Sequence, residues 1–432
     1  MRKKAAFLSL IPIIYFAVSG GPYGLEEIVK AVGPFHSLLF ILLVPLVWSI
    51  PEALVVGELS SNYPVQGGYY KWVQRALGNF WGFMRGWWSI IYSLIDLSIY
   101  PVLVCLYLKL LLPELNFWQC YIIQLLVIWG CAFINILGIR VVGNVLVVLQ
   151  LFIFSLFIIF MLAGAKYISL DFSPALHKST EITTYGLLFG LSVTFWNYIG
   201  LDGVSTVLGE IENPGKNYYK AVLLVVPLIV CFYFFPILVG VSIHQDWKSW
   251  DFGEYTYIAQ TMNLKWLAIA LIFGGMITFS GLFNSLTLTS TRVLSTMSKD
   301  GYLPAFFSKL HKKSGAPYLA IIVSAIAYSF LILIGFHNLV VYDVFFFLVA
   351  MLLEIISLVI LRKKTRKISD GFKIPFGSIG MYTVTGLACL TITFMILLNA
   401  FYFCTSPAKI MLTLFLLLSG IPVYFIYKEK IV

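Results

Sequence analysis

Long runs of apolar residues recur along the whole chain, and they limit what it can fold into more than any other feature. The runs lie near 6–32, 35–62, 79–112, 117–138, 141–165, 184–212, 219–245, 263–298, 317–336, 339–361, 380–403 and 408–427. A helix needs about 20 apolar residues to cross the hydrocarbon core of a bilayer. Backbone groups in that core must be satisfied internally, which favours helices. The sequence therefore predicts an all-α polytopic membrane protein with about twelve transmembrane helices.

Composition supports this fold class. Of the 432 residues, 60% are hydrophobic and 11% are charged, whereas soluble domains carry about 25% charged residues. The net charge is +10, which on a soluble chain would suggest a nucleic-acid partner. Here we expect a lipid bilayer as the partner and no nucleic acid. The six cysteines lie in or beside apolar runs without a C-x-x-C pair, so we expect small buried hydrophobic side chains, with no metal site and no disulfide.

The basic residues predict an orientation. If both termini lie on one side of the membrane, 22 of the 29 Lys and Arg residues fall on that side, with Arg85 and Arg140 among them. The positive-inside rule makes that side cytoplasmic. We therefore expect a multi-pass protein of the cell membrane, with cytoplasmic N and C termini.

Two of the predicted spans are interrupted by residues that disfavour a helix. The first span contains Ser19-Gly20-Gly21-Pro22-Tyr23-Gly24, and the sixth contains Asn197-Tyr198-Ile199-Gly200-Leu201-Asp202-Gly203. Glycine lowers helix propensity, and proline removes a backbone donor. Either interruption alone could be an ordinary kink, because glycine and proline are frequent in membrane helices. Unwound backbone at membrane depth must be buried in protein or line a cavity.

The two interruptions occupy matching positions, each in the first span of a five-span half. An odd number of spans inverts the second half relative to the first. Secondary transporters are built in this way, and they bind substrate where two discontinuous helices meet. We therefore predict one transmembrane transporter domain over 1–432, with inverted repeats at 6–165 and 184–361 and two additional helices at 380–427.

The helix ends at the interruptions predict a ligand. A helix that begins at Gly24 presents free N–H groups, which suit a carboxylate. A helix that ends near Tyr198 presents free carbonyl groups, which suit an ammonium group. A zwitterionic amino acid fits both ends. The predicted substrate contacts are Gly20, Gly21, Pro22, Tyr23, Gly24, Asn197 and Tyr198.

Three motifs resemble the amino acid–polyamine–organocation (APC) superfamily of transporters. The stretch FWNYIGLDGVSTVLGEIENPGKNYYKAV at 195–222 is similar to the family's helix 6 and the loop after it. Pro64-x-x-Gly67-Gly68-Tyr69 resembles the loop after helix 2, and MSKDGxLP at 297–304 resembles the loop after helix 8. The resemblance implies twelve helices with a five-plus-five inverted repeat, the leucine-transporter-like fold, in which helices 1 and 6 are broken. It also implies that Trp196 closes over bound substrate.

Within the superfamily, the stretches VSGGPYGLEEIV, WSIPEALVVGELS and NILGIRVVGNVLVVL look most like the branch of polyamine and L-type amino acid carriers. Polyamine carriers of that pattern have an acidic residue in helix 8, near the position where this chain has Asn284. The missing carboxylate favours an amino acid over a polycation, and Asn284 is a further predicted substrate contact. Helix 5 also lacks the buried lysine that some bacterial relatives use for proton coupling.

Ionisable residues within the spans are candidate functional groups, because a mid-bilayer charge costs at least about 2.5–3.5 kcal/mol. Asp96 lies midway along the third span, and it either binds the substrate amine, couples protons or bonds to a neighbouring helix. Asp202 either caps the N–H groups of Val204 or Ser205, or it carries a proton or binds the substrate amine. For Glu58 and Glu354 we predict pairing with cations of the inner side. We predict coupling or gating roles for Asp96, Trp196 and Asp202.

These observations predict a permease that moves amino acids by alternating access, by proton coupling or by exchange. A polyamine carrier of the same fold is the alternative. We expect a small-molecule substrate and no cofactor, with a proton as the coupling ion. The polar stripe Thr278, Ser280, Asn284, Ser285, Thr287 and Thr289 leaves sodium open, although such residues also join helices. The chain has no H-x-x-x-H, G-x-S-x-G or Walker-type run, so we do not expect an enzyme.

Overall fold

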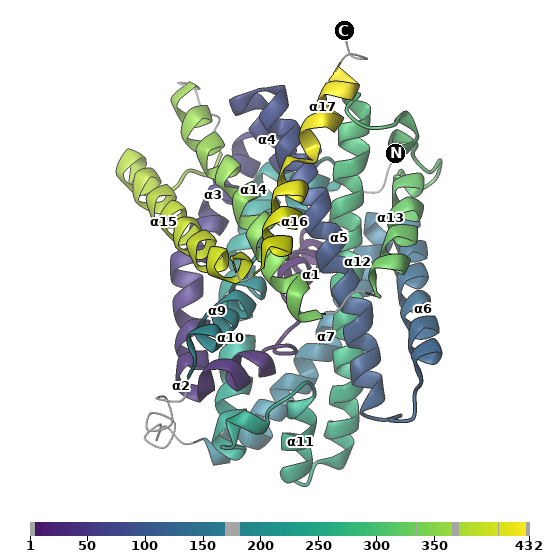
Figure 1. Cartoon of the computed structure of the whole chain (residues 1–432), viewed down its shortest axis with the longest axis vertical. Coiled ribbons are helices and arrows are strands. Elements are labelled where there is room, and N and C mark those ends of the chain that lie inside the picture. Colours follow the sequence, from purple (N-terminus) through teal and green to yellow (C-terminus); the bar gives the residue numbers. More distant parts are fainter. Residues whose placement is uncertain (1–4, 169–181, 334–335, 365–370, 405, 429–432) are drawn as a thin grey trace.

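The computed structural model describes residues 5–168, 182–333, 336–364, 371–404 and 406–428. Most helices run along the long axis of the molecule, and the start of α1 and the end of α17 lie toward the same end (Figure 1). The helices are α1 (Phe7–Val18), α2 (Glu26–Val44), α3 (Ile50–Asn62), α4 (Gly68–Leu77), α5 (Asn79–Lys109), α6 (Phe117–Ile136), α7 (Ile139–Gly164), α9 (Thr184–Trp196), α10 (Pro214–Ile243), α11 (Glu254–Thr261), α12 (Lys265–Lys299), α13 (Tyr318–Leu331), α14 (Phe336–Lys364), α15 (Gly377–Phe403), α16 (Pro407–Leu418) and α17 (Gly420–Lys428).

The described residues contain nine helical segments that are long and apolar enough to cross a membrane. Three shorter apolar helices, α1, α9 and α13, occur where three further spans are predicted. The first of the nine, Glu26–Asn62, joins α2 to α3 through the π-helical turn η1 (Pro45–Ser49). It is divided at Gly33, whose φ of 73° is not helical and which precedes Pro34. The all-α polytopic fold is confirmed, and the exact number of twelve membrane crossings stays a prediction.

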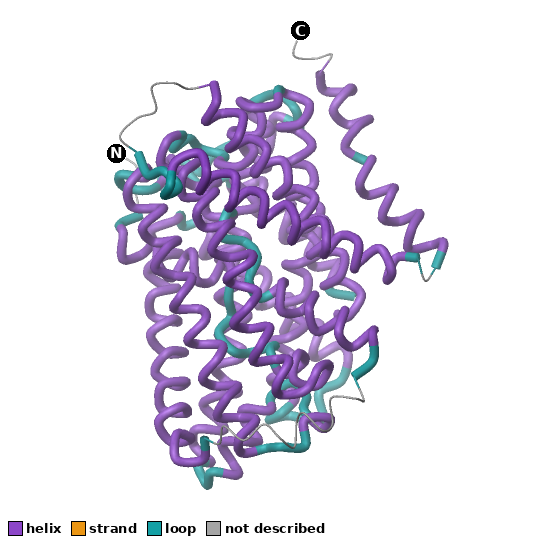
Figure 2. The backbone as a smooth tube through the Cα atoms, turned by 90° about the vertical axis from the view of Figure 1, so that its left-hand side faces the viewer, coloured by secondary structure: helices purple, strands orange, loops and turns teal. Residues whose placement is uncertain are grey.

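The interior of the bundle is built around α5 and α12, which pack along each other, and α14 also packs against α5. In the most apolar 18-residue stretch of α5, 61% of the residues are buried inside the protein. In the corresponding stretch of Pro407–Tyr427, 17% of the residues are buried. The C-terminal helices α16 and α17 lie on the outside of the bundle (Figure 2), where Trp87 and Trp88 of α5 donate to Ser419 and to the carbonyl of Leu417. Side chains that matter for a ligand therefore lie on the central helices, whereas the exposed apolar residues of the outer helices suit contact with lipid.

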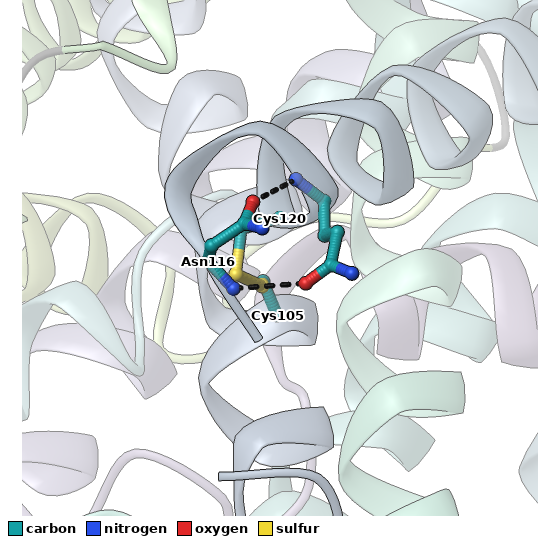
Figure 3. Close-up of a disulfide and its surroundings, with 4 residues drawn as sticks. Cys105, Asn116 and Cys120 are labelled. Carbon is teal, nitrogen blue, oxygen red and sulfur yellow. Dashed lines mark hydrogen bonds between the residues drawn. A yellow bond between two sulfur atoms is a disulfide. The ribbon is translucent and has the colours of Figure 1, made fainter. Parts of the chain in front are cut away.

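A disulfide joins Cys105 near the end of α5 to Cys120 near the start of α6 (Figure 3). The expectation that the cysteines form no disulfide is therefore wrong. The two helices are consecutive and joined by a short loop, so the end of one lies beside the start of the other, with the Cα atoms 5.8 Å apart. Asn116 caps α6, because its side chain accepts a hydrogen bond from the Gln119 N–H while the Gln119 side chain accepts one from the Asn116 N–H.

Arg85 does not lie in a cytoplasmic loop, as the charge analysis assumed. It lies within α5 and is fully buried, because two carboxylates from other helices surround it. Several other basic residues in that analysis lie outside the described residues, and the orientation stays a prediction. They are Arg2, Lys3, Lys4, Lys178, Arg366, Lys367 and Lys430.

Candidate functional site

The two predicted interruptions are real breaks, and they touch each other. The first separates α1 from α2 at residues 19–25, and the second separates α9 from the 3₁₀ helix η4 (Gly203–Glu210). Gly200 has a φ of 108°, and a Cβ atom there would lie 2.7 Å from the carbonyl oxygen of Ala17. Only glycine allows this approach, so the second break packs directly on the end of α1.

A small cavity of about 40 Å³ lies beside the breaks. Its walls come from α1, α4, α5, α9, α12, α14 and the second break. Three of its lining side chains are carboxylates, Asp96, Asp202 and Asp343, and none of the described lining residues is Lys, Arg or His. The remaining polar and aromatic lining residues are Tyr69, Tyr92, Ser93, Tyr100, Trp196, Thr289 and Phe347. The cavity is therefore acidic, and it is smaller than the pockets that hold small ligands.

Asp96 lies on α5 in the wall of this cavity. Its Oδ1 atom accepts a hydrogen bond of 2.7 Å from the Tyr100 hydroxyl and one of 3.0 Å from Trp196 Nε1. The rings of Trp196 and Tyr100 stack with centroids 6.0 Å apart. Trp196 is the last residue of α9, so this bond connects the end of a broken helix to the carboxylate.

Asp343 on α14 is a cavity residue that the sequence analysis missed. It is buried, its Oδ1 atom has no hydrogen-bond partner, and Asp96 is its charged neighbour. In the sequence, the indication is that Asp343 lies four residues inside the span predicted at 339–361. Sequence alone does not show that this side chain and Asp96, 247 positions apart, face the same space.

Asp202 lies at the second break and pairs with Arg85, with 2.5 Å between Oδ2 and Nη2. It makes no side-chain capping bond at the start of η4, so the predicted capping of Val204 or Ser205 is wrong. Arg85 Nε also donates to Glu354 Oε1 at 2.8 Å. Its guanidinium carbon lies 3.8 Å from the centroid of the Tyr69 ring. The prediction that Glu354 pairs with a cation is confirmed, and Glu58 likewise accepts from Arg362 at 3.1 Å.

The first break satisfies its own polar groups. The Gly24 N–H donates to Glu26 Oε2 at 2.6 Å, and the Gly21 N–H donates to Ser19 Oγ at 3.0 Å. Tyr23 is buried away from the cavity, and its hydroxyl donates to the carbonyl of Leu271. The predicted contacts Gly20, Gly21, Pro22, Tyr23 and Gly24 are not among the residues that line the cavity.

Three other predicted contacts also lie outside the cavity lining. Asn197 Nδ2 donates to the carbonyl of Val193, and the Tyr198 hydroxyl donates to that of Ile41. Asn284 Oδ1 accepts from Asn135 Nδ2 at 2.6 Å and joins α12 to α6. The Ser285 hydroxyl of the polar stripe likewise joins α12 to the carbonyl of Ile13. Of the predicted site residues, the structure brings Asp96, Trp196 and Asp202 together around one cavity.

A second cavity, of about 890 Å³, lies further along η4 and α12. Glu210 and Arg292 line it, and Arg292 Nε donates to Glu210 Oε1 at 3.1 Å. Between the two cavities, the Thr206 hydroxyl donates to the carbonyl of Thr289. This contact between η4 and α12 therefore lies between the small cavity and the large one.

A polar cluster outside the spans joins α4 to the loop after α12. Asp300 accepts from the Tyr70 hydroxyl at 2.6 Å and from Lys71 Nζ at 2.5 Å. Burial and the neighbouring carboxylate raise the pKa of the Tyr70 phenol, which therefore stays a hydrogen-bond donor. This cluster ties two of the three family-like motifs together at one end of the bundle.

The geometry is that of a membrane protein with an acidic site beside two broken helices, and comparisons with known proteins define its class. A family profile described as amino acid permease matches residues 7–421. The chain belongs to this family, which is part of the APC superfamily, and it is a secondary transporter.

Individual relatives carry narrower descriptions. The chain is 32% identical over 380 residues to the polyamine transporter RMV1 of Arabidopsis thaliana, covering 88% of this chain and 77% of that one. It is 26% identical over 407 residues to the branched-chain amino acid permease BcaP of Bacillus subtilis, covering 88% and 83%. The solved structure of MhsT in complex with L-phenylalanine matches with a TM-score of 0.66 at 14% identity, covering 92% of this chain and 100% of that one. This last match shows the leucine-transporter-like fold.

Proposed function

We propose that the chain carries organic amines with more than one positive charge, of the polyamine class, across the cell membrane. The observation that carries this proposal is the pair Asp96 and Asp343, which face one buried cavity with no cation among its described lining residues. Two buried carboxylates without a counter-charge attract ammonium groups. The similarity to a plant polyamine transporter supports the same substrate class.

The first break supports this choice over an amino acid. A substrate carboxylate needs free backbone N–H groups, and the carboxylate of Glu26 already accepts from the Gly24 N–H. Amino acids remain the second candidate, because the chain is also similar to a branched-chain amino acid permease. One transport measurement distinguishes a polyamine substrate, which is a cation, from an amino acid substrate, which is a zwitterion.

Transport proceeds by alternating access and is coupled to protons or to exchange. The small cavity and the larger cavity share η4 and α12, so a movement of η4 opens one toward the other. The bond from Thr206 to Thr289 must break in that movement. Both termini lie on the cytoplasmic side in this proposal, and the Cys105–Cys120 disulfide lies toward the opposite end of the bundle, where an oxidising compartment allows it to persist.

The test is uptake of labelled putrescine, spermidine, leucine and arginine into proteoliposomes. We expect saturable uptake of putrescine and spermidine, and loss of at least about tenfold in affinity for Asp343→Asn, because a buried charge pair is removed. Asp246→Asn, on the exposed loop after α10, is the matched control and keeps wild-type uptake. Uptake of leucine without uptake of either polyamine would assign the amino acid function instead.

A further inference from the structure

A second acidic cluster lies next to the cavity, and its charges do not balance. Arg85 from α5 pairs with Asp202 from the second break and with Glu354 from α14, and Glu52 from α3 lies beside these two carboxylates. All four side chains are at most 1% exposed. The other titratable groups that face the cluster are phenols, Tyr69 from α4, Tyr92 from α5 and Tyr218 from α10. With all three carboxyl groups ionised, the cluster would carry two uncompensated negative charges.

Burial makes that charge state costly, because neither water nor a second cation offsets the repulsion. Asp202 and Glu354 each contact Arg85 within 2.8 Å. Glu52 differs from both, since neither of its carboxyl oxygens has a hydrogen-bond partner. Its charged neighbours are Asp202 and Glu354, both acidic. The carboxyl group with acidic neighbours and no cation contact is the one that retains a proton.

Glu52 also lies where a change of charge would affect the second break. Its carboxyl group lies beside the backbone of Leu201 and Asp202, and α3 packs against η4. When ionised, it becomes an acceptor for backbone N–H groups of the break; when protonated, it is a weaker one. Its protonation state therefore biases the conformation of the break.

We propose that Glu52 is the proton site of the carrier, protonated when the cavity is empty and ionised when an organic ammonium group occupies it. This rests on the proposed function. Asp202 belongs both to the cavity wall and to the cluster, so an ammonium group in the cavity supplies positive charge close to Glu52. The carboxylic acid then gives up its proton to water. By linkage, protons and amine oppose each other's binding, which is the requirement for exchange of one for the other.

The experiment is proton release on binding, measured with a pH indicator in weakly buffered detergent solution of the full chain. Putrescine is added to the wild type, to Glu52→Gln and to Glu58→Gln. Glu58 is the matched control, because it is a buried glutamate on the same helix that already pairs with Arg362. The Glu52→Gln change keeps the size of the side chain and an oxygen that faces the backbone of Leu201 and Asp202.

We expect the wild type and Glu58→Gln to release protons on binding, and Glu52→Gln to release at least about fivefold fewer. The putrescine affinity of the wild type should rise by up to about tenfold per pH unit, because each bound ligand releases one proton, and Glu52→Gln should flatten this dependence. Undiminished proton release from Glu52→Gln at normal affinity would overturn the proposal. Release that persists in Glu52→Gln but disappears in Asp343→Asn would overturn it as well and assign the proton to the cavity.

Failure of the proposed function is recognised separately, because the wild type would then bind neither putrescine nor spermidine. Infrared spectra of the ligand-free protein still test Glu52 in that case. The carbonyl band of a protonated carboxyl group should weaken in Glu52→Gln and stay unchanged in Glu58→Gln. Identical spectra for the wild type and Glu52→Gln would overturn the assignment without reference to any substrate.

Discussion

The two breaks have similar sequences of helix-disfavouring residues but differ in how their polar groups are satisfied. In the first, the N–H groups of Gly21 and Gly24 bond to side chains two residues away, and the Tyr23 hydroxyl bonds to the carbonyl of Leu271 on α12. In the second, Trp196 donates to Asp96 and Asp202 pairs with Arg85, and both partners lie on α5. An ion pair to another helix must change when the segment moves. The comparison indicates that the second break, which carries the charged residue, responds to ligand and proton.

Loss of Arg85 tests the second break with the largest expected effect. Arg85→Met leaves Asp202 and Glu354 buried without their cation, which should cost about 3–5 kcal/mol of stability. Thermal unfolding in detergent measures this loss. Adding Glu354→Gln to Arg85→Met should restore part of it, because one buried charge is removed. An Arg85→Met protein as stable as the wild type would contradict the role of this pair.

Trp196→Ala should weaken binding of spermidine more than that of putrescine. The substitution removes one wall of the cavity and the donor to Asp96, at a cost of about 1–3 kcal/mol for the larger ligand. Competition against labelled putrescine in proteoliposomes gives both affinities. Equal losses for the two amines would indicate that Trp196 supports the fold without closing over the ligand.

Two glycines of the second break test whether close backbone packing or general flexibility explains the glycine at position 200. Gly200→Ala places a Cβ atom 2.7 Å from the Ala17 carbonyl at a φ of 108°, and it should cost about 1–3 kcal/mol. Gly203→Ala is the control, because its nearest neighbour would lie 3.9 Å away and its φ is ordinary. Unfolding temperatures of the two variants test the prediction, which fails if both shift equally.

Glu26→Gln tests the first break, with the smallest expected effect. The variant weakens the charge-assisted bond to the Gly24 N–H, at a cost of about 0.5–1.5 kcal/mol of stability. Because Glu26 does not line the cavity, the affinity for putrescine should stay at the wild-type value. A lowered affinity with unchanged stability would show that the first break takes part in binding after all.

Sequence patterns predict where a residue lies along a membrane helix better than which neighbouring helix its side chain faces. The apolar runs, both breaks and the residues Asp96, Trp196 and Asp202 followed from spacing and from the family resemblance. Arg85 and Glu354 are 269 positions apart, and only the packing of α5 on α14 brings them into contact. The same reason explains why Asp343 and Glu52 were missed, since a lone acid in a span does not indicate which helix it faces.

The Cys105–Cys120 disulfide also has a mechanical consequence. It ties the end of α5 to the start of α6, so these two helices move as one piece. The tied helix α5 carries both Asp96 and Arg85, which pair with the second break. The hairpin of α5 and α6 is therefore a rigid frame against which α9 and η4 can move while the spacing between Asp96 and Arg85 is kept.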